Sequence, residues 1–508
     1  MVLFFFFTLF VALGARLFWL QISQHDEYTK TVSRRQHTMI NSQPDRGEIF
    51  GQDKQGNLIP LARSRTFKTL ALAPKYITDP AVVTSALLEN FYFDKESLAE
   101  KIRRTDDPYE VLLRKLDPDQ ILTLAKKQLA GVLFEDDRRR IYPSSTTAAH
   151  LLGFVSKETD VEIGRYGLER YYESLLSGGE ASRDDSKHDK GFWDAFALSV
   201  REDRQDAARI ILTVDYIIQT KAEEVLSAAR QKWQADSGAL IVLEPKTGRI
   251  LAMAGAPNFD PNEFGNEKDF SVFLNTSVEA MYELGSVIKP ITMAAGIEEG
   301  VVTPESTYTD RGEIRLAGFT IKNFDERAYG VQTMTQVIEK SLNTGAVHVA
   351  RLLGQDRQYE YLRKFGFGER TAIDLPGELA GNLSNLDEGR EIDFATAAFG
   401  QGIAVTDIQL ASAIGVLANR GHLMKPHLVE TIVEASGNEL KIEPQLVREA
   451  VSPQTAQALT KMMVSAVRTG FENRAGIKGY FVAGKTGTAQ IPKSDGGGYS
   501  EEYIHTYV

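Results

Sequence analysis

The chain has 508 residues, of which 43% are hydrophobic, so it can fold at least two domains and is neither disordered nor repetitive. The formal net charge of −11 argues against nucleic-acid binding, and no basic, aromatic-rich stripe reverses this. The sequence contains no cysteine, which excludes a disulfide, a thiolate nucleophile and a cysteine-bound metal. This composition is compatible with a protein that lies outside the cytoplasm.

An apolar segment at the start of the chain predicts a membrane anchor. Residues 2–15 carry no charge, and the apolar pattern continues to Ile22 if Arg16 reaches the membrane interface beside Trp19. A cleaved signal peptide is the alternative, but no basic stretch precedes the apolar run and no small-x-small cleavage site follows it. We therefore expect a transmembrane helix over residues 1–22.

Residues 23–206 are polar and mixed, and we expect them to form an α+β domain. A turn at Gln55-Gly56 separates two short predicted strands. Apolar residues between positions 92 and 131 recur at helical spacing and predict helices. The charged run from Glu135 to Arg140 is typical of a solvated surface, and the charged segment 181–206 predicts a loop or an exposed hairpin.

A second domain is expected from residue 207 to residue 508. Residues 210–215 predict a strand, and a helix should follow from Tyr216 to about Lys232. Two nearly continuous apolar runs flank Pro245 and Gly248 and predict a hairpin whose strands are buried on both faces.

In this second domain, Ser286 is the only serine of the chain with a lysine, Lys289, three residues after it. Residues 291–296 predict a helix, so both side chains should lie on one side of a helix start. A serine hydroxyl attacks poorly until a base removes its proton, and a desolvated, neutral amine can be that base. The helix start adds N–H donors and a positive dipole end near a developing oxyanion. The alternative is a serine N-cap followed by a surface lysine.

Two further motifs follow in chain order, an S-x-N at Ser341 and a K-T-G at Lys485. Each has a second copy, the K-T-G at Lys246 and the S-x-N at Ser436. Both of these copies lie between strand-like runs and predict hairpin turns, and the K-T-G at Lys246 also precedes Ser286. We therefore assign the functional copies to Ser341 and Lys485.

The ordered set S-x-x-K, S-x-N and K-T-G resembles that of penicillin-binding proteins and β-lactamases. Leu342 stands where β-lactamases more often carry Asp, which points away from that branch. Segments of the first domain, R-G-x-I from Arg46, R-x-Y-P from Arg140 and G-x-x-G-x-E from Gly164, are similar to the pedestal of class B penicillin-binding proteins. The resemblance runs from Arg46 to the last residue.

The resemblance implies an α+β fold in three parts. These are a membrane helix over residues 1–22, a pedestal of the dimerisation type over residues 23–206, and a transpeptidase domain over residues 207–508. The last domain is expected to have an antiparallel sheet flanked by helices. It is also expected to be incomplete at its C-terminus, because the chain stops before the family's last strand and closing helix.

Each motif has a role in the family that the resemblance carries to this chain. The nucleophile, its base, the proton relay and the group that fixes the donor amide would be Ser286, Lys289, Ser341 and Asn343, in that order. The substrate's terminal carboxylate and acyl group would be bound by a strand over residues 480–489. In that strand, a cation, a hydroxyl, a small residue and an oxyanion-hole N–H would come from Lys485, Thr486, Gly487 and Thr488.

The implied reaction is D,D-transpeptidation of peptidoglycan stem peptides through a Ser286 acyl-enzyme, with release of D-Ala. β-Lactams would acylate Ser286 as substrate mimics, and no cofactor or metal is implied. The implied setting is a bacterial inner or plasma membrane, with a single span and an extracytoplasmic catalytic domain. The partners would be a polytopic glycan polymerase of the SEDS class and other division proteins. The segment K-T-G-T-A-Q favours the division type over the elongation type.

Three alternatives stay open to different degrees. A D,D-carboxypeptidase or β-lactamase would form the same acyl-enzyme but pass it to water, and a non-catalytic β-lactam sensor or divisome scaffold would keep the fold without turnover. A Ser-His-Asp hydrolase is disfavoured because Ser286 lacks a G-x-S-x-G elbow. Metal catalysis is also disfavoured. His422 and His427 lie on either side of Pro426 but do not form the H-E-x-x-H pattern of a zinc site, so we interpret them as solvated loop histidines.

Overall fold

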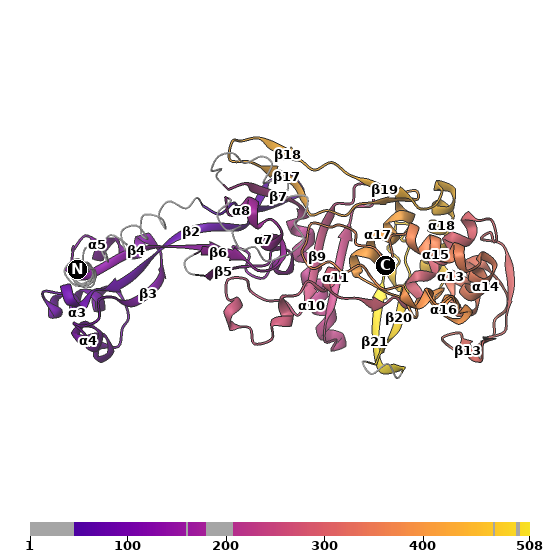
Figure 1. Ribbon diagram of the computed structural model, residues 1–508, viewed down its shortest axis with the longest axis horizontal. Coiled ribbons are helices and arrows are strands. Elements are labelled where there is room, and N and C mark those ends of the chain that lie inside the picture. Colours follow the sequence, from indigo (N-terminus) through magenta and orange to yellow (C-terminus); the bar gives the residue numbers. More distant parts are fainter. Residues whose placement is uncertain (1–44, 159–160, 179–206, 471–472, 494–497) are drawn as a thin grey trace, which may run out of the picture.

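The structure is a computed structural model that describes residues 45–158, 161–178, 207–470, 473–493 and 498–508. The molecule is elongated, with a narrow N-terminal pedestal at one end and a broad C-terminal domain at the other (Figure 1). The predicted anchor over residues 1–22 and the predicted loop over residues 181–206 lie outside the described residues. Within the described ranges, no helix has both the length and the apolar character needed to cross a membrane.

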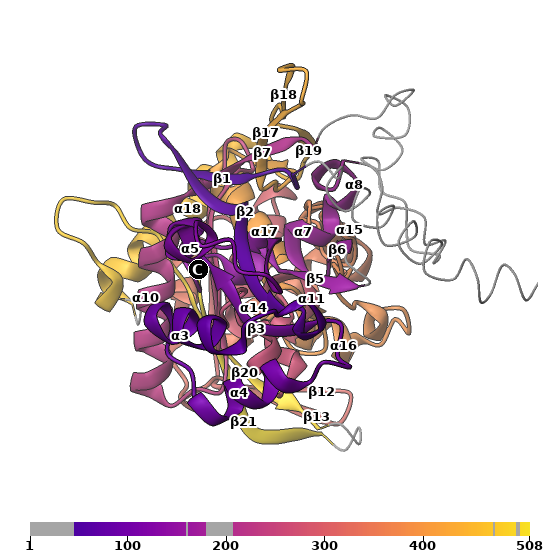
Figure 2. The ribbon, with the colours of Figure 1, turned by 90° about the vertical axis from the view of Figure 1, so that its left-hand side faces the viewer.

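The pedestal is organised around one long strand, β2, which pairs antiparallel with β1, β3 and β4. At the far end of β2, Leu70 and Leu72 pack with Leu87 and Leu98 of two helices in a small separate core. Figure 2 looks along the molecule from this end and shows β3 and helices α3–α5 gathered around β2. The pedestal elements are β1 (Ile49–Gln52), β2 (Leu58–Leu72), α3 (Pro80–Asn90), α4 (Lys95–Arg103), β3 (Glu110–Leu116), α5 (Pro118–Ala125), β4 (Val132–Ile141), α6 (Ala149–Leu152), β5 (Val155–Glu158), β6 (Val161–Gly164), α7 (Gly167–Tyr171) and α8 (Glu173–Leu176).

Two sequence-based expectations for the pedestal were wrong. Residues 110–116, predicted as part of a helical region, form strand β3, because β2 offers them a partner and tertiary pairing overrides the helical spacing. The run from Glu135 to Arg140 lies in strand β4, and Asp137 and Arg140 are buried rather than solvated.

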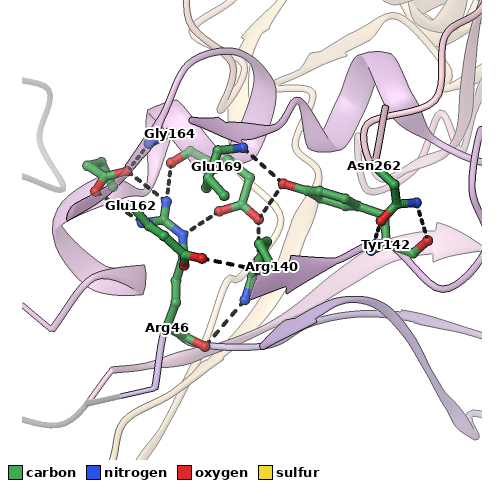
Figure 3. A network of polar contacts seen from close by, with 9 residues as sticks. Arg46, Arg140, Tyr142, Glu162, Gly164, Glu169 and Asn262 are labelled. Atoms are coloured by element: carbon green, nitrogen blue, oxygen red, sulfur yellow. Dashed lines mark hydrogen bonds and ion pairs between the residues drawn. The ribbon is translucent and has the colours of Figure 1, made fainter. Parts of the chain in front are cut away.

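A buried network of charged groups holds the start of the described chain against α7 and α8 (Figure 3). Glu169 accepts hydrogen bonds from Arg46 Nε at 2.7 Å, from Arg140 Nε at 2.6 Å and from the Tyr142 hydroxyl at 3.3 Å. The second guanidinium edge of Arg46 binds Glu173 at 2.7 Å and 3.0 Å. Burial alone would raise the pKa of Glu169, but the guanidinium groups of Arg140 and Arg46 hold it below its usual value.

The sheet of the pedestal continues into the C-terminal domain. Strand β7 (Arg209–Asp215) runs parallel to β1, and β17 (Val429–Val433) lies antiparallel on its other side, followed by β18 (Glu439–Lys441). The order is therefore β18-β17-β7-β1-β2-β3, with β4 also on β2. This sheet crosses the predicted domain boundary at residues 206/207, so the two parts of the chain share backbone hydrogen bonds.

The C-terminal domain is built around α12, whose residues 289–296 are all buried. Helices α14, α15 and α18 pack against α12 and enclose the main apolar core. The α-helices described in this domain are α10 (Tyr216–Trp233), α11 (Thr276–Glu279), α12 (Lys289–Glu298), α13 (Met334–Glu339), α14 (Asn343–Leu353), α15 (Gln355–Lys364), α16 (Glu391–Ala397), α17 (Asp407–Ala418) and α18 (Pro453–Thr469).

The remaining strands of this domain pair locally. The predicted hairpin forms from β8 and β9, with α10 packed against β9, but β8 is half-buried along its whole length rather than buried on both faces. Within the described residues, the hairpins β8–β9 and β20–β21 each form a two-stranded sheet of their own. The locally paired strands of this domain are β8 (Gly238–Leu243), β9 (Ile250–Ala256), β10 (Tyr282–Glu283), β11 (Thr307–Asp310), β12 (Glu313–Leu316), β13 (Phe319–Lys322), β14 (Gly330–Thr333), β15 (Ala404–Val405), β16 (His422–Met424), β19 (Leu446–Glu449), β20 (Thr486–Pro492) and β21 (Tyr499–Tyr507).

Candidate active site

Ser286 lies at the start of the central helix. Residues Gly285–Ile288 form a 3₁₀ turn, and Lys289 begins α12 directly after it, with Pro290 in the first turn of the helix. A proline is favourable there because its missing N–H would have had no partner within the helix. Val287 and Ile288 are fully buried in the main core, whereas Ser286 is half-buried. The apolar neighbours therefore fix the serine at a rigid helix start while its own side chain stays accessible.

Lys289 joins the first motif to the second. Its side chain is 1% exposed, and its Nζ donates to the Ser341 carbonyl oxygen at 2.5 Å and to Ser341 Oγ at 3.2 Å. Ser341 has a φ of +53°, a left-handed conformation that is uncommon for residues other than glycine and is found at many functional sites. The predicted base and the predicted proton relay therefore lie in direct contact.

Asn343 is the first residue of α14, and its Nδ2 donates to the carbonyl oxygen of Lys322 at 2.8 Å. Leu342, between Ser341 and Asn343, is buried in the main core. The alternation places Ser341 and Asn343 on the accessible side of the segment, where both are half-buried.

The K-T-G strand lies against the nucleophile. A Cβ atom at Gly487 would lie only 2.7 Å from the Leu284 carbonyl oxygen, and one at Gly285 only 2.4 Å from the Thr488 carbonyl oxygen. Gly285 also has a φ of +58° and donates its N–H to Gly400 O at 3.0 Å. Glycine at both positions therefore allows β20 and the 3₁₀ turn to approach backbone to backbone, which no residue with a side chain would permit.

Lys485 precedes the strand rather than lying within it. The sequence predicted a strand over residues 480–489, but β20 begins at Thr486, so this expectation was wrong at its start. Lys485 has no exposed surface, and its Nζ donates to Thr486 O at 3.1 Å and to Thr486 Oγ1 at 3.3 Å. Thr486 and Thr488 are exposed and alternate with buried Gly487 and Ala489. The cation therefore lies behind a hydroxyl that faces the outside.

The second copies of the two motifs lie in turns, as predicted. Lys246 is in the turn between β8 and β9, and Ser436 is in the turn between β17 and β18. His427 was expected to be solvated but is buried, whereas His422 is half-buried and its Nε2 lies 3.3 Å from Glu449. The described part of the chain holds no group of three or more metal-ligating side chains.

One carboxylate near the nucleophile could not be predicted from the sequence. Glu283 accepts the Gly402 N–H at 3.0 Å and the Tyr499 hydroxyl at 3.0 Å and 3.2 Å, and its burial raises its pKa. Tyr499 belongs to β21, so this contact ties the hairpin of the K-T-G motif to the strand that precedes Ser286. A pair separated by more than 200 residues leaves no periodicity from which it could be predicted.

Comparison with known proteins agrees with this geometry. Residues 238–508 match the family described as Penicillin binding protein transpeptidase domain, and residues 41–192 match the Penicillin-binding Protein dimerisation domain. The chain belongs to the penicillin-binding proteins. The order of the two domains is that of class B, and the protein is a serine-type transpeptidase.

Individual relatives cover most of the chain. Stage V sporulation protein D of Bacillus subtilis is 30% identical over 100% of this chain and 78% of its own length. The peptidoglycan D,D-transpeptidase FtsI of Escherichia coli is 28% identical over 97% of this chain and 80% of its own. The crystal structure of penicillin binding protein 3 from Mycobacterium tuberculosis, complexed with aztreonam, has a TM-score of 0.69 at 27% identity and covers 92% of this chain and 86% of that one.

Proposed function

We propose that this transpeptidase cross-links peptidoglycan stem peptides through an acyl-enzyme on Ser286 during cell division. The observation that carries the proposal is the convergence of three motifs from distant parts of the chain on one half-buried serine. The Lys289–Ser341 contacts join the first two motifs, and the close approach of β20 to Gly285 joins the third.

The acylation step uses these groups in a defined order. Lys289 accepts the proton of Ser286 as Oγ attacks the carbonyl carbon of the D-Ala-D-Ala amide. The N–H groups of Ser286 and Thr488 donate to the oxyanion of the tetrahedral intermediate. Ser341 passes its hydroxyl proton to the amine of the terminal D-Ala as the C–N bond breaks, and it takes back the proton that Lys289 received. An amine of a neighbouring stem then attacks the ester carbon and loses a proton to Lys289, and the ester C–O bond breaks as Lys289 returns this proton to Ser286 Oγ.

Substrate binding falls to the other motif residues. Thr486, with the Lys485 cation 3.3 Å behind its hydroxyl, receives the terminal carboxylate of the donor peptide. Asn343 binds the amide of the acyl donor. A β-lactam presents a carboxylate and a reactive amide in the same arrangement and acylates the same serine.

The cellular setting is also part of the proposal. The similarity to FtsI and the segment K-T-G-T-A-Q favour a division role. The apolar run over residues 1–22 supports a single membrane anchor, an extracytoplasmic catalytic domain and a location in the bacterial inner or plasma membrane. A polytopic glycan polymerase of the SEDS class is the proposed partner.

Product analysis tests the reaction. The protein is incubated with a stem pentapeptide that ends in D-Ala-D-Ala and with an acceptor peptide that carries a free amine. We expect a cross-linked dimer and one D-Ala per cross-link, both lost in Ser286→Ala. Release of D-Ala with a tetrapeptide but no dimer would indicate a carboxypeptidase instead, and acylation without any product would indicate a sensor or scaffold.

A further inference from the structure

A buried carboxylate lies behind the S-x-N segment. Asp310, the last residue of β11, is 2% exposed. Its oxygens accept the Thr344 hydroxyl at 2.7 Å and the Asn323 side-chain amide at 3.0 Å and 3.1 Å. They also accept the backbone N–H groups of Gly312 at 3.0 Å and Tyr329 at 2.9 Å. The two loops that follow β11 and β13 and the first turn of α14 therefore meet on one side chain.

The chemistry of this cluster requires an ionised Asp310. Every group named above is a donor, and a carboxylate accepts at both oxygens whereas an amide or a protonated acid accepts fully at only one. Thr344 is in the first turn of α14, an eleven-residue helix whose positive dipole end favours a negative charge. Hydrogen bonds to an ionised acceptor are also stronger than neutral ones, so the cluster is rigid.

The cluster encloses Asn343 from two sides. On one side, Thr344 follows Asn343 in the chain and is bound through its hydroxyl to Asp310 and through its N–H to Asn323 Oδ1 at 3.3 Å. On the other side, the carbonyl of Lys322 accepts the Asn343 amide at 2.8 Å, and Lys322 directly precedes Asn323. Asp310 thus fixes both the backbone that carries Asn343 and the carbonyl that orients its side chain.

The same cluster also restrains the backbone conformation of Ser341. The left-handed conformation of Ser341 costs free energy and persists only where the surroundings determine it on both sides. On its N-terminal side, the Ser341 N–H donates to Ile338 O at 3.3 Å. On its C-terminal side, the restraint comes from Thr344 and Asp310. Since Lys289 contacts both oxygens of Ser341, movement of this segment would also change the contact with the base.

We propose that Asp310 is a positioning residue for acylation, which acts through Asn323 and Thr344 to hold Asn343 and Ser341 in their reactive places. The proposal rests on the proposed function, because it assigns Asp310 to the same acylation step. Asp310 acts through its contacts with Asn323 and Thr344, so it is a positioning residue rather than a catalytic one.

The test separates positioning from stability. Stopped-flow acylation by a fluorescent penicillin gives the acylation rate constant and the dissociation constant of the reversible complex. We expect Asp310→Asn to lower the rate constant about 10- to 100-fold, as displacements of about 1 Å do, while the dissociation constant changes about threefold or less. The matched control is Glu378→Gln. Glu378 is also buried and accepts a threonine hydroxyl and two backbone N–H groups, at Thr371 and Ala372.

Thr344 provides a second variant pair if Asp310→Asn does not fold. Thr344→Val keeps the shape but removes the hydroxyl donor, and Thr344→Ser restores it. We expect Thr344→Val to slow acylation about tenfold and Thr344→Ser to be close to the parent. Rates within twofold of the parent for Asp310→Asn or Thr344→Val, or an equal loss in Glu378→Gln, would overturn the positioning role alone. A parent protein that no penicillin acylates would overturn the proposed function and this role with it.

Discussion

Lys289 shows how a single residue acquires its role from burial and contacts. The side chain is almost completely buried, yet its Nζ reaches two oxygens of Ser341 one turn from Ser286. The spacing S-x-x-K was visible in the sequence, and the structure brings Ser341 to it from 52 residues away. The left-handed conformation of Ser341 could not be predicted, because nothing in Ser341-Leu342 favours a positive φ over an ordinary helical one.

Replacement of Lys289 tests whether it is the base. A general base contributes about 10²–10⁴-fold, so Lys289→Ala should slow acylation by that order while reversible binding of the β-lactam changes little. Stopped-flow acylation measures both quantities. Lys364→Ala is the control, because Lys364 forms an ion pair with a helix neighbour, Glu360, and stacks on Tyr361. If Lys289→Ala loses only a few-fold, the lysine merely anchors the segment, and another group takes the proton.

At the scale of elements, the place of a motif in the fold distinguishes the functional copy from the second copy, although both copies have the same sequence. One K-T-G lies in the turn of the β8–β9 hairpin, and the other opens strand β20 beside the nucleophile. The flanking apolar runs and Pro245 were enough to predict the turn. Strand β3 could not be predicted, because its leucines also fit a helix and only the presence of β2 decides between the two.

The two K-T-G copies should respond differently to the same substitution. Lys485→Ala removes a fully buried cation behind Thr486, and we expect acylation to fall at least about tenfold through the loss of a charge-assisted contact to the carboxylate. Lys246 is exposed in a turn, and Lys246→Ala should change stability by about 0.5 kcal/mol or less. Acylation rates and thermal unfolding are compared for both. Equal losses of acylation would show that the choice between the copies has no basis.

The whole molecule is held together across its length by a shared sheet and by buried polar contacts. Tyr142 N–H donates to Asn262 Oδ1 at 3.0 Å, and the Tyr172 hydroxyl donates to Asp374 at 3.1 Å. His150 of α6 packs edge-on against Phe259, and its Nε2 lies 3.0 Å from Val272 O. The pedestal sequence predicted an α+β domain but not these contacts, since each joins residues about 100 or more positions apart.

His150 makes this junction sensitive to acid. Burial lowers the pKa of His150 to about 4, below the ordinary value near 6.5. Between these two pH values the native state therefore binds fewer protons than the unfolded chain. Its contribution to stability is therefore complete above about pH 6.5 and is lost as the pH falls towards 4. Between pH 7 and pH 5 we expect the free energy of unfolding to drop by about 2 kcal/mol from this residue.

Urea unfolding at the two pH values measures this drop. His150→Gln can still donate to Val272 O but does not titrate, so its unfolding free energy should fall by about 2 kcal/mol less than that of the parent over the same range. His422→Gln is the matched control, because it makes the same substitution at a half-buried histidine of the β16–β19 pair and so measures the effect of the substitution itself. A parent-like slope in His150→Gln would show that the acid sensitivity of the junction has another source.

Peptide mapping after acylation examines the proposed nucleophile most directly. The protein is incubated with a fluorescent penicillin, digested, and the labelled peptide is sequenced by mass spectrometry. The convergence of the three motifs predicts one adduct, on Ser286, that is absent from Ser286→Ala and present in Lys246→Ala. An adduct on Ser341, or on no serine, would contradict the assignment of Ser286 as the nucleophile.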